Sequence, residues 1–114
     1  MTENNTLSRT ENGNVFKCSG CSKIHIEYKN LNFNFNEKEY FDFAKYFKEL
    51  DGSYWEKMNS HFPYRKKIIV PVGHSSLNVL LNNEEVQELK KLFSKALNSS
   101  NEMISTFNYQ LYPN

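Results

Sequence analysis

The sequence predicts an α+β fold, a two-layer sandwich in which a mostly antiparallel sheet of four or five strands carries two helices on one face. One observation is an internal repeat: residues 23–50 align with residues 67–97 almost in register, with two extra residues near Gly73. The other is that each copy has two stretches of alternating apolar and polar residues, followed by apolar residues at helical spacing. Each copy therefore reads strand, strand, helix, and we interpret the chain as a duplicated unit.

Alternation of apolar and polar side chains predicts the strands. In the first copy residues 23–29 alternate, Lys29-Asn30 is a tight turn in which asparagine tolerates the left-handed conformation, and residues 31–35 alternate again. An earlier stretch from Val15 forms a hairpin whose turn is Cys18-Ser19-Gly20-Cys21. The inward positions are Ile24, Ile26, Tyr28, Leu31, Phe33 and Phe35 in the first copy and Ile68, Val70, Val72, Leu77, Val79 and Leu81 in the second. The opposite face would then show Lys17, Lys23, His25, Glu27, Lys29, Asn32, Asn34, Lys67, Ile69, Pro71, Asn78 and Leu80.

Capping residues mark the start of both helices. Asn36 with Glu39, and Asn82 with Glu85, have the spacing of a capping box. Asp51-Gly52 ends the first helix. The inward stripes consist of Tyr40, Phe43, Ala44, Phe47 and Leu50 in the first helix and Val86, Leu89, Phe93, Ala96 and Leu97 in the second.

Length and composition indicate one domain. The chain has 114 residues, of which 39% are hydrophobic and 24% charged, as is usual for a globular domain of this size. We expect a disordered arm over residues 1–14, because that stretch is almost entirely polar. A single domain is expected over residues 15–97, and a tail over residues 98–114 that is ordered at most in part.

The connection between the copies, residues 51–66, is long for a compact domain, and such loops commonly carry function. Ser53 with Glu56 predicts a short helix over residues 54–59. Aromatic and basic residues that are frequent in binding surfaces gather there, and we interpret them as a partner or ligand surface: Trp55, Tyr54, Phe62, Tyr64, Arg65 and Lys66. Two alternatives stay open. The aromatic side chains could plug the open end of the core, or the run Arg65-Lys66-Lys67 could help to bind single-stranded nucleic acid.

Charge and hydropathy point to an intracellular protein. The formal net charge of +1 provides no global attraction for polyanions, so nucleic acid is a disfavoured partner. No apolar stretch reaches the roughly 18 to 20 residues that span a bilayer, and the polar N-terminus lacks the apolar region of a secretory signal. We therefore expect a cytoplasmic protein without a membrane partner. In that compartment the two cysteines should be reduced or bound to a metal.

Cys18 and Cys21 have the spacing of a zinc knuckle, in which a tight turn brings two thiolates onto one metal ion. Structural zinc takes four protein ligands, and His61 and His74 are the candidates to complete the set. Alternatively, the cysteines of two chains could together provide the four ligands of one zinc ion. His25 is a poor ligand, because four residues along a strand beyond Cys21 span about 13 Å. Zinc is the one cofactor that the sequence suggests.

The same pair of cysteines has two other interpretations. A redox dithiol usually has its first cysteine at a helix N-terminus, whereas Cys21 is followed by a strand pattern. The simplest interpretation is a reduced or occasionally oxidised hairpin turn, in which Gly20 permits positive φ. No histidine has a nucleophile or carboxylate at a recognisable spacing, so the sequence predicts no catalytic residue.

The order of these motifs along the chain resembles that of a known protein family. The order Asn12-Gly13-x-Val15-x-x-Cys18-x-x-Cys21, followed by a strand, Asn30-Leu31 and the segment FNFNEKEYFDF, resembles a family of small uncharacterised bacterial proteins, a domain of unknown function. Its members share an N-terminal CxxC and a strand-strand-helix unit. The resemblance covers roughly residues 13–97 and implies no activity.

The leading functional hypothesis is a non-enzymatic intracellular binding or regulatory module, with a metal at the CxxC turn as an open option. Its partner would be another protein or a second copy of the chain. The alternatives are a thiol-dependent redox protein that uses Cys18 and Cys21 and a single-stranded nucleic-acid binder. The pKa of the Cys18 thiol separates the redox alternative from the others, because a structural thiol keeps a pKa near about 8.5.

Overall fold

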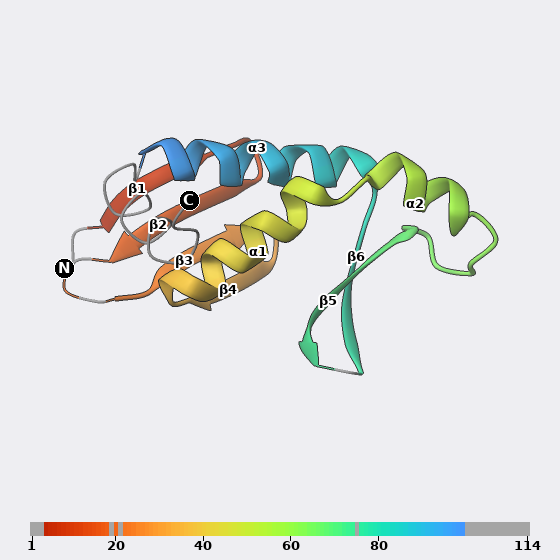
Figure 1. The fold of residues 1–114 in the computed structure, drawn as a ribbon, viewed down its shortest axis with the longest axis horizontal. Coiled ribbons are helices and arrows are strands. Elements are labelled where there is room, and N and C mark those ends of the chain that lie inside the picture. Colours follow the sequence, from red (N-terminus) through yellow and green to blue (C-terminus); the bar gives the residue numbers. More distant parts are fainter. Residues whose placement is uncertain (1–3, 19, 21, 75, 100–114) are drawn as a thin grey trace, which may run out of the picture.

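The structure is a computed structural model that describes residues 4–18, 20, 22–74 and 76–99. In these residues six strands form two antiparallel sheets, and three helices accompany them, so the fold is α+β (Figure 1). The elements are β1 (Asn4–Arg9), β2 (Gly13–Cys18), β3 (Ile24–Tyr28), β4 (Leu31–Phe35), α1 (Glu37–Glu49), α2 (Gly52–Met58), β5 (Ile68–His74), β6 (Leu77–Leu81) and α3 (Asn83–Ser99).

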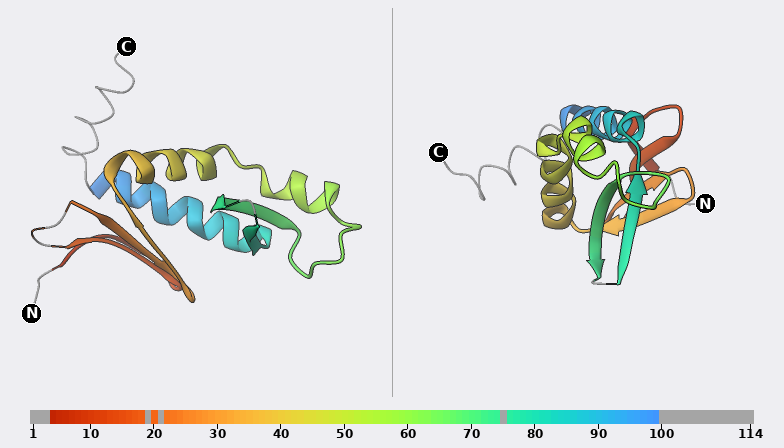
Figure 2. Two further views of the ribbon diagram at one scale, coloured as in Figure 1. Left: turned by 90° about the horizontal axis from the view of Figure 1, so that it is seen from below. Right: turned by 90° about the vertical axis from the view of Figure 1, so that its right-hand side faces the viewer.

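The strands do not form the single sheet that the sequence predicted. Strands β1 to β4 form a four-stranded sheet in chain order, and β5 with β6 form a separate two-stranded sheet that projects from the body (Figure 1). Figure 2 shows α1 and α3 on one face of the larger sheet. Side chains rather than a backbone ladder connect the two sheets, since Phe33, Val72 and Val79 line one small apolar gap.

The N-terminal segment is a strand where the sequence predicted a disordered arm. β1 pairs with β2 from Asn4↔Cys18 to Arg9↔Asn14, with a register shift between Thr6 and Ser8. Leu7 packs against the core, and Ser8 is buried. Backbone hydrogen bonds along a neighbouring strand need no particular side chains, so a polar composition does not exclude this pairing.

The turn between β3 and β4 lies at Lys29-Asn30, as predicted, but the left-handed residue is Lys29, with φ of 54°. Positive φ is unfavourable for lysine, so other contacts hold it there. The Lys29 N–H donates to Asn12 O at 2.9 Å, and its ammonium binds Glu85.

The helix starts of both copies are the capping boxes that the sequence predicted. In α1 the Asn36 side chain accepts from Glu39 N at 2.8 Å, and Glu39 Oε1 accepts from Asn36 N at 2.9 Å. Asn82 and Glu85 make the same two bonds, at 2.8 and 2.9 Å. The predicted short helix in the connection exists as α2, but Asp51 caps it instead of Ser53.

The core lies between the helices and the sheets. In α1 the buried residues follow the predicted stripe, with Phe43 half-buried beside them. The buried stripe of α3 also includes Leu92. The buried hydrophobic residues are Val15, Ile24, Ile26, Tyr28, Tyr40, Ala44, Phe47, Leu50, Ile68, Val70, Leu81, Val86, Leu89, Leu92, Phe93 and Ala96.

Both halves of the chain have the order strand, strand, helix. Their equivalent capping boxes fit an internal duplication, and superposition of the halves remains a prediction. None of the described helices is both long enough and apolar enough to cross a membrane.

Candidate functional site

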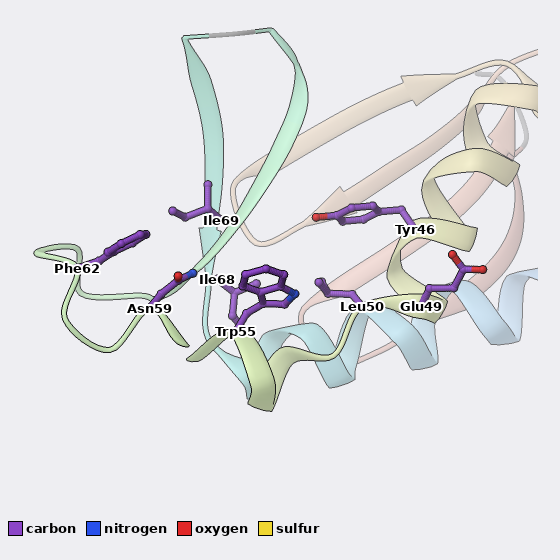
Figure 3. Close-up of a pocket in the computed structure, with 8 residues that line it drawn as sticks. All are labelled: Tyr46, Glu49, Leu50, Trp55, Asn59, Phe62, Ile68 and Ile69. Atoms are coloured by element: carbon purple, nitrogen blue, oxygen red, sulfur yellow. The ribbon is translucent and has the colours of Figure 1, made fainter. Parts of the chain in front are cut away.

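An open pocket lies between the end of α1, helix α2 and the start of β5 (Figure 3). Its volume is about 530 Å³. We call it the Trp55 pocket, and its lining consists of Tyr46, Glu49, Leu50, Trp55, Asn59, Phe62, Ile68 and Ile69. Most of these residues are apolar or aromatic, and Glu49 is the one charged residue among them.

The Trp55 pocket combines a buried floor with exposed aromatic walls. Leu50 and Ile68 belong to the core and are 8% and 1% exposed, whereas Trp55 and Tyr46 are 42% and 38% exposed. Figure 3 shows the Trp55 indole beside Leu50 and Ile68, with the Tyr46 ring extending toward the same space from α1. A ligand seated there would cover aromatic surface that now faces water.

Three hydrogen bonds hold the walls of the pocket in place. Asp51 accepts a hydrogen bond from Tyr54 N at 3.1 Å and so caps α2, which carries Trp55. Glu56 accepts from Asn83 N at 2.7 Å and ties α2 to the start of α3. The Asn59 side chain donates to Lys67 O at 2.9 Å, which fixes the connection against β5.

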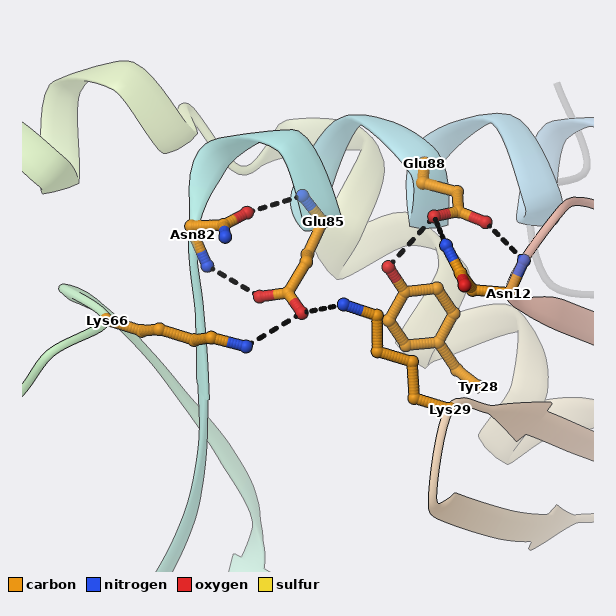
Figure 4. Close-up of polar contacts among 7 residues, drawn as sticks. All are labelled: Asn12, Tyr28, Lys29, Lys66, Asn82, Glu85 and Glu88. Atoms are coloured by element: carbon orange, nitrogen blue, oxygen red, sulfur yellow. Dashed lines mark hydrogen bonds and ion pairs between the residues drawn. The ribbon is translucent and has the colours of Figure 1, made fainter.

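A second group of polar residues lies beyond the pocket, on the first turns of α3 (Figure 4). Glu85 is buried and accepts from both Lys29, at 2.5 Å, and Lys66, at 2.9 Å. Burial by itself would raise the pKa of Glu85, but the hydrogen bonds from the two lysines outweigh it and hold that pKa below its usual range. Lys29 lies in the β3–β4 turn and Lys66 lies in the segment between α2 and β5. Glu85 therefore holds both segments against α3.

Glu88 lies one turn further along α3 (Figure 4). It accepts from Asn12 N and Asn12 Nδ2, both at 2.9 Å, and from the Tyr28 hydroxyl at 3.0 Å. Burial would raise the pKa of Glu88, but the hydrogen bonds it accepts, among them those from Asn12 and Tyr28, lower it to about 2. Glu88 thereby holds the β1–β2 turn against α3, so both glutamates have structural roles.

The partner surface predicted from the sequence only partly coincides with the Trp55 pocket. Trp55 and Phe62 line it, whereas Tyr54 and Tyr64 are exposed elsewhere on the same segments. Lys66 is bound to Glu85, and Arg65 is exposed outside the lining. Sequence reasoning missed the other lining residues as pocket residues: Tyr46, Glu49, Leu50, Asn59, Ile68 and Ile69. The available signal was that Tyr46 is an aromatic residue off the inward stripe of its helix.

Two of the four residues predicted as zinc ligands, Cys18 and His61, lie on separate segments. Cys18 ends β2 and His61 follows α2, and Figures 1 and 2 show these segments at opposite ends of the molecule. The His61 ring packs on Phe62 with centroids 4.8 Å apart. Cys21 and the side chain of His74 lie outside the described residues. Within the described part of the chain, no group of three or more potential ligands is clustered for a metal ion.

Cys18 has a different neighbour, which sequence reasoning had rejected. His25 Nε2 lies 3.2 Å from Cys18 Sγ, and His25 Nδ1 lies 2.6 Å from Asn34 Oδ1. The rejection of His25 counted residues along the strand from Cys21, but the hairpin brings β3 back beside Cys18. Cys18 is disulfide-bonded in the structure, so the expectation of a reduced or metal-bound thiol does not describe this state.

Comparison with known proteins gives a family match without a function. A family model described as "Family of unknown function (DUF6686)" matches residues 1–114. Searches of curated proteins and of solved structures returned no match.

Proposed function

The chain belongs to a family of unknown function, DUF6686, and from that premise we propose that it is a non-enzymatic binding module that captures a protein segment in the Trp55 pocket. The observation that carries the proposal is Trp55 itself. This tryptophan is 42% exposed beside a buried apolar floor. Tryptophan is the residue most enriched in binding hot spots, and such residues act where a pocket excludes water.

The lining specifies the chemistry of the segment. Aromatic and aliphatic walls favour a bulky apolar anchor residue, such as leucine or methionine. Glu49 provides the one formal charge of the lining, and the exposed rings of Tyr46 and Trp55 can receive a cation on their faces. The preferred segment therefore has an apolar anchor next to a lysine or arginine.

The same features disfavour the nucleic-acid alternative. Lys66 binds Glu85, and the Lys67 ammonium donates to Phe62 O, so two of the three consecutive basic residues are used within the fold. The carboxylate of Glu49 would repel a phosphate backbone at the pocket itself. Among the described residues that line the pocket there is no serine, cysteine or histidine, which favours binding over nucleophilic catalysis.

The chain offers a direct spectroscopic test, because Trp55 is its only tryptophan. Peptides would be selected from a random display library on the wild-type protein and titrated into it while tryptophan emission is recorded. We expect enriched peptides to carry a bulky apolar residue beside Lys or Arg and to shift the emission to shorter wavelength. Glu49→Gln should weaken these peptides severalfold and leave neutral ones unchanged.

Tyr64→Ala is the matched control, because Tyr64 is a similarly exposed aromatic residue outside the pocket lining. This variant should bind the selected peptides as the wild type does, while Leu50→Ala should lose them. Peptides that bind Leu50→Ala unchanged, or a selection dominated by acidic peptides, would contradict the proposal.

A further inference from the structure

Three side chains form a row across the face of the larger sheet that the helices leave open. Cys18 ends β2, His25 belongs to β3 and Asn34 to β4, and paired strands place them on neighbouring positions of one face. Figure 2 shows both long helices on the other side of this sheet. Cys18 and His25 are half-buried and Asn34 is exposed, so a reactant can approach the row from solvent.

The row has a defined hydrogen-bond polarity. Asn32 Nδ2 donates to the backbone oxygen of Ile26 at 3.2 Å, which directs Asn32 Oδ1 toward Asn34. Asn34 Nδ2 donates to that oxygen at 3.0 Å, which leaves Asn34 Oδ1 to face His25 Nδ1 at 2.6 Å. The backbone carbonyl therefore sets the orientation of both amides.

This polarity selects one tautomer of His25. An amide oxygen can only accept, so His25 Nδ1 carries a proton. When Cys18 is reduced, the neutral imidazole therefore turns the lone pair of Nε2 toward the thiol. A base that faces a sulfur atom and is oriented by a third residue is the arrangement of cysteine nucleophiles in enzymes. The ring of Phe16 packs against His25, with centroids 5.1 Å apart, and restricts its rotation.

We propose that Cys18 is the reactive sulfur of a thiol–disulfide exchange site, with His25 as its base and Asn34 as a positioning residue. A small-molecule thiol reductant such as glutathione first converts the disulfide of Cys18 to the thiol. The Cys18 thiol then transfers its proton to His25 Nε2, and the thiolate attacks one sulfur of a disulfide substrate. A bond forms between Cys18 Sγ and that sulfur, and the substrate disulfide bond breaks. The leaving thiolate takes the proton from His25. The products are a mixed disulfide and a free thiol, without net oxidation or reduction. The disulfide-bonded Cys18 of the structure is an oxidised state of the same sulfur.

The test measures the thiolate pKa of Cys18 from the pH dependence of its alkylation by iodoacetamide. Reduced Cys21→Ser protein is used, in which Cys18 is the one remaining thiol. We expect the inflection at least about one unit below 8.5 and its return toward about 8.5 in His25→Gln. We use the pH of the inflection as the criterion, because the alkylation rate at pH 7 should change by only about threefold. A tenfold gain in thiolate is offset about threefold by the lower nucleophilicity of a less basic thiolate.

Asn34 provides the test of positioning. Asn34→Ala removes the acceptor for Nδ1–H and should move the inflection part of the way toward about 8.5, whereas Asn34→Asp keeps an acceptor and should keep the low inflection. Because Asn34 is exposed on the open face, these changes leave the core intact. His61→Gln is the matched control and should have no effect, since its ring contacts Phe62 instead. Glutathione disulfide is the exchange probe, and mixed disulfide should form more slowly in His25→Gln below pH 8.

Two results would overturn the proposal. One is an inflection at about pH 8.5 that His25→Gln does not move. The other is stoichiometric zinc in freshly purified wild-type protein that Cys18→Ser removes, which would assign the sulfur and imidazole to a metal site. Far-UV circular dichroism of each variant confirms that the comparison is between folded proteins. Failure of the peptide experiment at the Trp55 pocket would leave this site unaffected, because the two sites share no residue.

Discussion

Phe47 of α1 and Phe93 of α3 meet with their ring centroids 5.4 Å apart and their planes inclined by 65°. The sequence alignment of residues 23–50 with 67–97 places them at corresponding positions, and they are 1% and 2% exposed. Edge-to-face contact between rings at this distance adds to the free energy gained by burial. Helices α1 and α3 therefore contact each other through these two phenylalanine rings.

Truncation of either phenylalanine should be strongly destabilising. Phe47→Ala and Phe93→Ala should each lower the free energy of unfolding by about 3 to 5 kcal/mol, because each leaves a cavity in the core. Urea unfolding followed by circular dichroism measures this. Tyr54→Ala, at an exposed aromatic residue, should cost less than about 1 kcal/mol. A similarly small cost at Phe47 or Phe93 would show that its helix is packed differently.

Tyr40 is a buried residue whose hydroxyl has no hydrogen-bond partner among the described residues. Burial also raises the pKa of this hydroxyl. Tyr40→Phe removes the unsatisfied group and keeps the ring, so it should leave stability unchanged or raise it by up to about 1 kcal/mol. Thermal unfolding at neutral pH measures the effect. A loss of more than about 1 kcal/mol would indicate a partner for the hydroxyl.

Glu85 should contribute more to stability than the exposed ion pair of α1. Glu85→Gln keeps an oxygen for the capping bond to Asn82 N but loses the charge that faces Lys29 and Lys66, and should cost about 1 to 2 kcal/mol. Asp42→Asn is the control. It breaks the exposed pair with Lys38 at 2.8 Å and should cost about 0.5 kcal/mol or less. Equal costs in urea unfolding would contradict the structural role of Glu85.

Acid should destabilise the fold through Glu88. Its pKa in the folded chain is about 2, below the ordinary value of 4.5. A carboxylate with a depressed pKa contributes stability that is complete above about pH 4.5 and is lost as pH falls toward 2. Because Glu88 is partly exposed, we expect a loss of about 1 to 2 kcal/mol. Glu88→Gln should reduce the slope of stability against pH in this window, and an unchanged slope would refute the assignment.

Gly13 lies where β2 starts against α3. A β-carbon at Gly13 would be 2.8 Å from Leu92 Cδ2 and 3.1 Å from Tyr28 Cδ1, in the buried core. Gly13→Ala should therefore cost about 1 to 3 kcal/mol through overpacking. In a Leu92→Val background, where the neighbouring side chain is shorter, the same change should cost less, as a double-mutant cycle would show. Additive effects would argue against direct contact.

Sequence reasoning by itself determined the local elements. The Asn36 and Asn82 capping boxes, the alternation in β3 and β4, and the burial of Tyr40 and Phe47 all follow from hydrogen bonds and side-chain periodicities that extend over a few neighbouring residues. Each of these interactions depends on residues that are close together in the chain, so it can be predicted from one sequence. The helix in the connection was predicted for the same reason, although its cap is Asp51.

Tertiary structure alone decided how these elements pair and which side chains meet. Nothing local distinguishes one sheet from two, because the side-chain pattern of a strand does not determine which strand pairs with it. β1 was missed because a neighbouring strand provides its hydrogen bonds. The Trp55 pocket and the row of Cys18, His25 and Asn34 join residues from separate elements. Distances along the chain say little about such neighbours, since a hairpin turns back and places His25 beside Cys18.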